Sequence, residues 1–186
     1  MRPLIATVLC LCAASAYAQA PPPKQGPPPK NSFSVIGGAG TTYDDESSLG
    51  RGMLLGAAYD RVLFGTTRVD FSVELLTHDR DSGYFQSIGR TVIGGVSLLH
   101  RFGRGDVQPY VFGGVTAGYH TGTNTFATEP FPVSSTRAGT RLGFGIAFRG
   151  EHVEISPELR MNGFFTRDDS DPWMAPSFGL RVGWRK

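Results

Sequence analysis

Two histidines are the side chains in this sequence best placed to do acid–base chemistry, because hydroxyl-bearing residues lie beside both of them. A histidine activates a nearby hydroxyl for acyl transfer when an acidic side chain orients its ring. The histidines are His78 and His120, and the hydroxyl and acidic candidates are Thr77, Thr121, Thr123 and Glu129. The histidine-x-serine spacing of known deacylases is missing, since Thr121 and Gly122 follow His120. We therefore expect no catalytic residue and interpret both histidines as interfacial side chains near strand ends.

The composition gives no support to other common chemistries. Both cysteines, Cys10 and Cys12, precede residue 18, so the rest of the chain has no thiol for catalysis, disulfides or metal binding. The net charge of +2 does not indicate a basic surface that could bind nucleic acid. The glycine clusters lack the strand–helix context of a nucleotide site. We expect neither a cofactor nor a metal ion.

The first 31 residues predict export rather than a folded core. An apolar run over 4–14 follows Arg2 and precedes Ala16-Tyr17-Ala18, a small-residue cleavage site. These are the features of a signal peptide over 1–18, and the run is too short to cross a bilayer as a helix. Residues 19–31 contain six prolines and predict an extended, proline-rich periplasmic spacer.

From residue 32 onward, apolar and polar side chains alternate with a period of two, which predicts β-strands. In the clearest segment Val69, Phe71 and Val73 share one face, and Asp70 and Glu74 share the other. Eight such segments lie at 32–43, 52–62, 68–75, 90–102, 108–120, 141–149, 153–162 and 177–184. The outward face of the fourth stays open between Val92, Val96 and Leu98 on one side and Ile93 and Leu99 on the other.

The connections between these segments decide the architecture. Three are short turns, at 63–67, 103–107 and 150–152, and four are longer polar loops, at 44–51, 79–89, 121–135 and 167–173. This alternation is typical of transmembrane β-barrels, whose short turns face the periplasm and whose long loops face outside. The sequence therefore predicts an all-β fold, one eight-stranded antiparallel up-and-down transmembrane β-barrel over 32–186.

Aromatic residues gather at the predicted strand ends, where the two lipid headgroup regions would lie. We expect an aromatic girdle of outward-pointing rings at Tyr59, Phe102, Tyr119, Phe148, Trp173 and Trp184. Tyr110 and Phe164 fall at strand ends as well.

If the apolar faces contact lipid, the charged faces must be enclosed. The expected ionic network of the barrel interior contains Arg68, Asp70, Glu74, Arg141, Arg149, Glu154, Glu158, Arg160 and Arg181. Buried charges are costly unless they are paired. The pairing hypothesis joins Glu74 or Glu158 to Arg141, Arg160 or Arg181. Because eight strands leave an interior just wide enough for side chains, a polar plug is favoured over a polar conduit.

Three segments resemble a known family. They are Gln-Pro-Tyr-Val-Phe-Gly-Gly-Val at 108–115, a penultimate hairpin built from 143–148 and 155–160, and the closing strand at 179–184. They resemble the small Gram-negative outer-membrane β-barrel domain proteins, over about 32–186. The resemblance implies an eight-stranded outer-membrane barrel and no single shared activity. Pro157 interrupts one strand of this pattern, so we expect a β-bulge there.

These expectations describe a non-enzymatic outer-membrane barrel with a side-chain-filled interior, which presents surface loops for envelope integrity or surface interaction. Two alternatives stay open: a narrow channel or carrier of small hydrophobic molecules, and a lipid A-modifying enzyme. Expected partners are outer-membrane lipid, the barrel assembly machinery during biogenesis, and an extracellular molecule contacted through 121–135 and 79–89. We expect a monomer in the outer membrane of a Gram-negative bacterium, reached by signal-peptide-dependent export.

Overall fold

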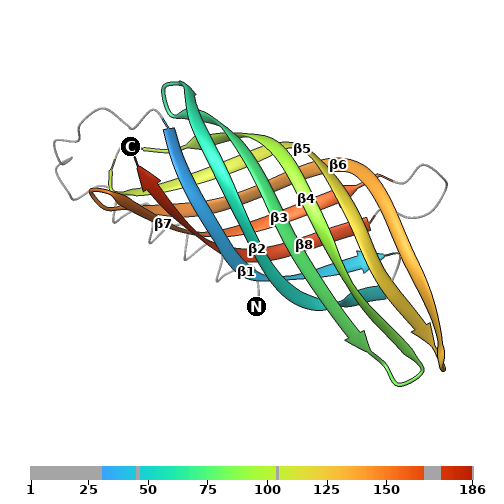
Figure 1. Cartoon of the computed structure of the whole chain (residues 1–186). Helices are drawn as coiled ribbons and strands as arrows, with labels where there is room; N and C mark the ends of the chain where they lie inside the picture. Colours follow the sequence, from blue (N-terminus) through green and yellow to red (C-terminus); the bar gives the residue numbers. More distant parts are fainter. Residues whose placement is uncertain (1–30, 45–46, 104, 166–172, 186) are drawn as a thin grey trace, which may run out of the picture.

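The computed structural model describes residues 31–44, 47–103, 105–165 and 173–185 (Figure 1). The predicted signal peptide and nearly all of the spacer lie outside these residues. The strands are β1 (Asn31–Asp44), β2 (Ser47–Phe64), β3 (Thr67–Asp81), β4 (Phe85–Arg101), β5 (Val107–Phe126), β6 (Glu129–Arg149), β7 (Val153–Phe164) and β8 (Trp173–Arg185).

Each strand pairs antiparallel with its neighbours in sequence, and β1 pairs with β8 to close the sheet (Figure 1). The closing ladder joins Phe33 to Trp184 and Val35 to Val182. Closure pairs the edge strands with each other, which is the condition for a sheet to cross a bilayer. The predicted eight-stranded antiparallel up-and-down barrel is confirmed. The described residues include no helix that is both long enough and apolar enough to cross a membrane.

The wall is inverted relative to a water-soluble protein, because its apolar side chains point outward. On β3, Val73 is 61% exposed while the adjacent Glu74 is 1% exposed. On β7 and β8, Leu159 and Leu180 are exposed, and Arg160 is buried. An exposed apolar band around a charged interior is stable when lipid, rather than water, surrounds it.

The facing of β4 follows the same rule and settles the question that its sequence leaves open. Its exposed residues are Val92, Val96 and Leu98, and its buried ones are Ile93 and Leu99. The ladder with β3 enforces this choice, because Ile93 lies opposite the buried Glu74 and Val96 lies opposite the exposed Phe71. Side chains opposite each other on paired strands share one face of the sheet.

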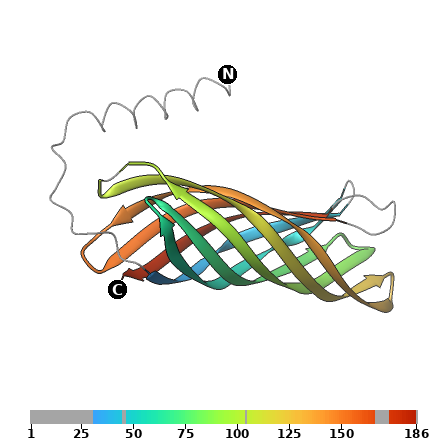
Figure 2. The ribbon, with the colours of Figure 1, turned by 90° about the horizontal axis from the view of Figure 1, so that it is seen from above.

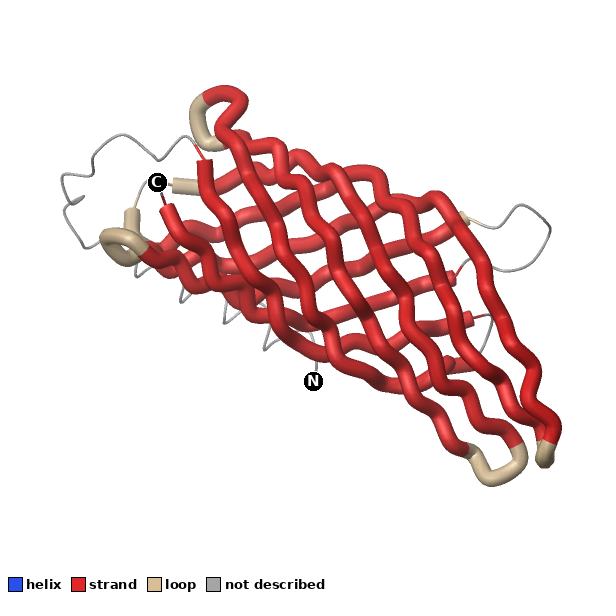
Figure 3. The backbone as a smooth tube through the Cα atoms, viewed as in Figure 1, coloured by secondary structure: helices blue, strands red, loops and turns tan. Residues whose placement is uncertain are grey.

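In their described residues, three segments predicted to be loops, 44–51, 79–89 and 121–135, are mostly continuations of strands. β3 and β4 run on to a turn at 82–84, and β5 and β6 run on to a turn at Ala127 and Thr128. The ranges 79–89 and 121–135 are therefore paired hairpins, and Figure 3 shows them as strands that end in short turns. Figure 2 shows the same tips projecting at the end opposite the end of β8. The segment 121–135 is polar, which suggested a loop, but it is also rich in threonine, a residue that favours strands.

Pro157 is accommodated without the predicted bulge. The β6–β7 register is the same on both sides of it, since Gly145 pairs with Glu158 and Phe148 pairs with Ile155. The two intervening pairs are missing from that ladder, while Pro157 pairs in register with Leu180 on β8. Proline has no N–H to donate, so a local gap toward β6 replaces an inserted residue, and the bulge prediction was wrong.

Candidate functional site: the enclosed interior and its outer mouth

The nine side chains predicted for the ionic network all lie inside the wall. Eight are buried residues: Arg68, Asp70, Glu74, Arg141, Glu154, Glu158, Arg160 and Arg181. The ninth, Arg149, is a half-buried residue whose side chain is only 5% exposed. The nine fall into two groups, one at mid-barrel and one at the end of the short turns.

Glu74 of β3 is the first centre of the mid-barrel group. Arg141 of β6 lies 2.9 Å from Glu74 Oε1, and Arg160 of β7 contacts the same oxygen. Arg141 also donates from Nε to Asn162 Oδ1 over 2.8 Å and contacts the hydroxyl of Ser72. Two guanidinium groups therefore converge on one enclosed carboxylate, which offsets part of the cost of burying them.

Glu158 of β7 is the second centre. Arg160 contacts Glu158 Oε1, and Arg181 Nε lies 3.5 Å from the same atom. Tyr110 Oη donates a hydrogen bond to Glu158 Oε2 over 2.9 Å. Arg181 continues to β3, where its Nη1 donates to Asp70 Oδ1 over 2.8 Å. The contacts thus join β3, β5, β7 and β8 across the lumen.

The second group lies at the end of the short turns, around Glu154 of β7. Arg101 of β4 forms a bidentate pair with it, with Nη1 and Nη2 at 2.6 and 2.7 Å from its two oxygens. Arg149 Nε lies 3.3 Å from Glu154 Oε2. Beside them, Arg68 pairs with Asp60 of β2. The bidentate geometry is the strongest form of such a pair.

Asp60, Arg101 and Tyr110 belong to these groups and were missing from the predicted network. Asp60 and Arg101 lie near strand ends, where the apolar alternation is weakest. The signal for Arg101 was the facing of β4, because an inward Leu99 also places Arg101 inward, two residues further on. For Tyr110, its position at a strand end suggested a lipid interface, whereas it shares the inward face with Phe112.

An apolar layer lies between the ionic groups and the outer mouth. On β3, Leu76 follows Glu74 along the inward face, and on β7, Phe164 follows Asn162. Leu76 and Phe164 belong to a buried apolar cluster that also includes residues level with the ionic groups, such as Ile93 opposite Glu74. The cluster contains Ile36, Leu54, Ala58, Leu76, Ile93, Phe164, Trp173 and Ala175. A packed apolar layer of this kind excludes water and hydrated ions from the axis of the barrel.

Five of the six residues predicted for the aromatic girdle point outward, with exposures between 39% and 51%: Tyr59, Phe102, Tyr119, Phe148 and Trp184. Trp173 corrects the prediction, because it is 3% exposed and lies inside the outer mouth. The period of two explains this, since Trp173 shares the inward face of β8 with Ala175. Tyr110 and Phe164 also point inward, and Tyr110 packs over Gly145 on β6.

The two histidines lie at the outer mouth and stack on each other. The rings of His78 and His120 stack, with centroids 5.0 Å apart and 17° between their planes. Thr91 Oγ1 lies 3.1 Å from His120 Nδ1. Thr77 is exposed on the outer face and hydrogen-bonds to the β2 backbone, and Glu129 begins β6 at the hairpin tip. Thr77, Thr121 and Thr123 line a depression of about 470 Å³ together with His78 and Asp79. Neither ring nitrogen of His78 has a hydrogen-bond partner among the described residues, so this histidine activates none of those hydroxyls in this arrangement.

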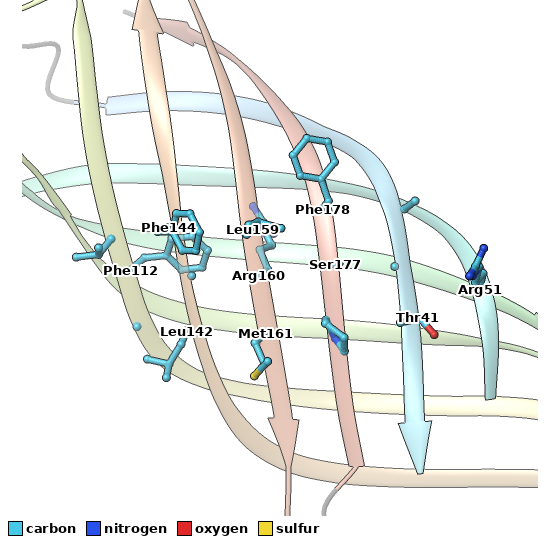
Figure 4. Close-up of a pocket in the computed structure, with 16 residues that line it drawn as sticks. Thr41, Arg51, Phe112, Leu142, Phe144, Leu159, Arg160, Met161, Ser177 and Phe178 are labelled. Carbon is cyan, nitrogen blue, oxygen red and sulfur yellow. The ribbon is translucent and has the colours of Figure 1, made fainter. Parts of the chain in front are cut away.

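A shallow depression of about 950 Å³ lies on the outer wall over β1, β2 and β5–β8 (Figure 4). Its lining is mainly apolar and includes Leu142, Phe144, Leu159, Met161 and Phe178. Figure 4 shows Phe144 and Phe178 on either side of Leu159. All five residues are exposed members of the outward band, so the depression faces the bilayer rather than the lumen.

No protein-family model matches this chain, and no curated protein matches its sequence. Solved structures do match. Neisserial surface protein A is 10% identical with a TM-score of 0.67, over 87% of this chain and 100% of that one. Ail, the attachment invasion locus protein of Yersinia pestis, was solved with the heparin analogue sucrose octasulfate. It is 13% identical with a TM-score of 0.59, over 84% and 97% of the two chains. The outer membrane enzyme PagL is 14% identical with a TM-score of 0.52, over 84% and 99%.

At these identities the likeness concerns the fold. The closed sheet and the outward apolar band of this chain are features of the outer-membrane β-barrel fold. The chain has the fold of the eight-stranded outer-membrane β-barrels of Gram-negative bacteria.

Proposed function

We propose that this protein is a closed, non-enzymatic barrel of the Gram-negative outer membrane that anchors two long hairpins at the cell surface. The contact between Glu74 and Arg160 carries the proposal. β3 and β7 lie four strands apart in either direction around the eight-stranded barrel, so this contact crosses the whole lumen. The interior is built as a bonded plug, and the hairpins are the parts left to interact with other molecules.

The burial of the charges supports a plug over a narrow channel. Charged side chains that line a water-filled pore stay hydrated, whereas Glu74, Arg141 and Glu158 are each 1% exposed. The apolar layer above them adds a second barrier on the same axis. Eight strands also enclose too little space for both these side chains and a continuous column of water.

The hairpins support a role at the cell surface. Phe85 on β4 pairs with Phe126 on β5, and the Ala127 N–H donates to the Tyr84 carbonyl over 2.9 Å, so the two hairpins form one sheet. At its tip, Tyr84 is 82% exposed, Phe126 65% and Phe131 51%. Exposed aromatic rings on paired strands favour contact with another molecule over simple solvation. Residues 79–89 and 121–135 therefore remain our candidates for contact with an extracellular partner.

The arrangement of the histidines favours a scaffold over a lipid A-modifying enzyme. PagL shows that an enzyme can have this fold. In this chain, however, Thr91 on His120 is buried inside the mouth, and Thr67 on His100 lies at the end of the short turns. Neither threonine presents a hydroxyl to acyl chains of the outer leaflet. The outer-wall depression lies within the lipid-facing band, so it supports contact with membrane lipid and not catalysis.

The proposal is tested by bilayer conductance. We expect no current steps from the purified protein in planar bilayers. Replacing Glu74 and Arg160 by serine together with Leu76 and Phe164 of the apolar layer removes both barriers and is expected to admit small ions. The exposed Arg51→Ser variant is the matched control and should stay silent. Steady unitary currents from the unmodified protein would show that the lumen is open and would contradict the proposal that side chains plug it.

The location is tested separately by envelope fractionation. We expect the protein in the outer membrane, with different gel migration before and after heating, as a folded barrel resists detergent until heated. Recovery in the soluble periplasmic fraction would contradict the membrane assignment.

A further inference from the structure

A small polar pocket at the outer mouth contains buried donors that lack acceptors. It has a volume of about 190 Å³ and lies between inward-facing ends of β4, β5, β6 and β8. The side chains that matter are Ser87, His120, Asn124, Ser135, Arg137 and Trp173. No carboxylate is found among the described residues that line it.

Trp173 and Arg137 provide the two donors without partners. Trp173 is 3% exposed, and its Nε1–H makes no hydrogen bond with any described residue. Arg137 Nη1 is also buried without a hydrogen-bond partner. The Arg137 guanidinium lies over the Trp173 ring, with its Cζ 5.8 Å from the ring centroid. The ring holds the cation in place but offers no acceptor in the plane of its N–H groups.

Neighbouring groups add further donors. Ser87 Oγ donates to Asn124 Oδ1 over 2.9 Å, so the carbonyl of that amide is used and its nitrogen keeps two hydrogens to donate. Ser135 lies directly opposite His120 in the β5–β6 ladder and contributes a hydroxyl to the same lining. A guanidinium, an indole N–H, an amide N–H₂ and a hydroxyl therefore surround one small space.

We propose that this pocket binds the oxyanion group of a soluble molecule, a carboxylate, phosphate or sulfate, with Arg137 as counter-ion and Trp173 as second donor. Such groups accept several hydrogen bonds at once, and guanidinium is their best-matched partner. Ser87, Arg137 and Trp173 all extend from the inward face, so the pocket opens to the water of the mouth and not to the bilayer. This goes beyond the proposed scaffold role, because it gives the barrel a ligand of defined chemistry.

Trp173 is a built-in reporter for the test. In a Trp184→Phe background it is the single tryptophan left. The protein in detergent micelles is titrated with inorganic phosphate, sulfate and acetate, with chloride at matched ionic strength as the reference. We expect a saturable change in Trp173 emission with at least one of the three oxyanions and none with chloride.

Matched variants assign the effect to the pocket. Arg137→Gln is expected to weaken binding about tenfold to a hundredfold. Arg137→Lys should weaken it by less, because lysine keeps the positive charge but lacks the paired N–H groups of the guanidinium. Arg90→Gln removes the same charge from an exposed position on β4 and should leave binding unchanged. Heat-modifiable migration establishes that each variant is folded.

Three results would overturn the proposal. The first is the lack of a saturable response in the Trp184→Phe protein. The second is a response of the folded Arg137→Gln and Arg137→Lys variants that equals the response of the protein that keeps Arg137. The third is a response that needs a phosphorylated glycolipid in the micelle and is not seen with soluble oxyanions, because it would place the acceptor in the bilayer.

Discussion

Tyr110 on β5 lies directly opposite Gly145 on β6, and its hydroxyl reaches Glu158 on β7 at 2.9 Å. A Cβ on Gly145 would lie 2.6 Å from Tyr110 Oη and 2.8 Å from the Pro157 carbonyl oxygen. The missing side chain is what admits the ring, and the ring in turn completes the hydrogen bonding of a buried carboxylate. Local packing and the ionic network therefore depend on each other at this position.

We expect Gly145→Ala to lower the free energy of unfolding more than Tyr110→Phe does. Tyr110→Phe removes one hydrogen bond to a charged acceptor, a loss of about 1.5–3 kcal/mol, and leaves the ring in place. Gly145→Ala displaces the ring and breaks the same hydrogen bond. Urea unfolding from phosphatidylcholine vesicles, followed by gel migration, measures both. Gly37→Ala is the control, since nothing lies within 4 Å of a Cβ there; a loss no larger than the control's would refute this account.

The two arginines on Glu154 should differ in their contributions to stability. Arg101 makes the bidentate pair, while Arg149 makes one contact at 3.3 Å. Arg101→Gln is therefore expected to lower the free energy of unfolding more than Arg149→Gln. Glu154→Gln, which leaves both guanidinium groups without a carboxylate partner at that site, should cost about 3–5 kcal/mol. Urea titrations rank the three variants. Equal losses for the two arginine variants would mean that the bidentate geometry adds nothing.

His78 is a polar side chain whose replacement should stabilise the barrel. It is 2% exposed, and neither ring nitrogen has a hydrogen-bond partner among the described residues. His78→Leu removes both nitrogens and is expected to raise the free energy of unfolding by about 1 kcal/mol. His100→Leu is the contrasting variant, since it removes the 2.9 Å contact between His100 Nδ1 and Thr67 Oγ1 and should lower stability. A loss in the His78 variant would point to an unrecognised acceptor or donor at that ring.

The sequence was sufficient for the strand number, the pairing order and most facings, because lipid outside and enclosed charge inside impose one period of two along every membrane-facing segment. Trp173 shows the limit of arguing from position at a strand end, since the alternation of β8 would have turned it inward. In 121–135 both faces meet water, so the apolar alternation disappears although the strand continues. The Arg101–Glu154 pair was beyond sequence reasoning, because contacts across a lumen depend on the stagger of the strands.

The tip of the β5–β6 hairpin stores strain that a single substitution can relieve. Ala127 has a φ of 58°, a left-handed conformation that costs a residue with a Cβ about 1–2 kcal/mol. Ala127→Gly is expected to stabilise the tip and slow its cleavage by a nonspecific protease added outside intact cells. Thr128→Gly, at the neighbouring turn position, is the control and should not slow cleavage. Faster cleavage of Ala127→Gly than of the unmodified protein would show that chain flexibility, not strain, governs the tip.

The fluorescence of the two tryptophans should differ in its sensitivity to brominated lipid, because Trp184 belongs to the girdle and Trp173 to the interior. Trp184 is 49% exposed on the outer wall, whereas Trp173 is 3% exposed inside the mouth. Trp173→Phe leaves Trp184 as the single fluorophore, and Trp184→Phe leaves Trp173. In vesicles of acyl-chain-brominated phosphatidylcholine, emission from Trp184 should be strongly quenched by direct contact with the bromines. Emission from Trp173 should stay close to its value in unbrominated lipid, since the wall and Phe164 separate it from the acyl chains. Equal quenching of the two would place Trp173 on the lipid face and would contradict both the inverted wall and the pocket at the mouth.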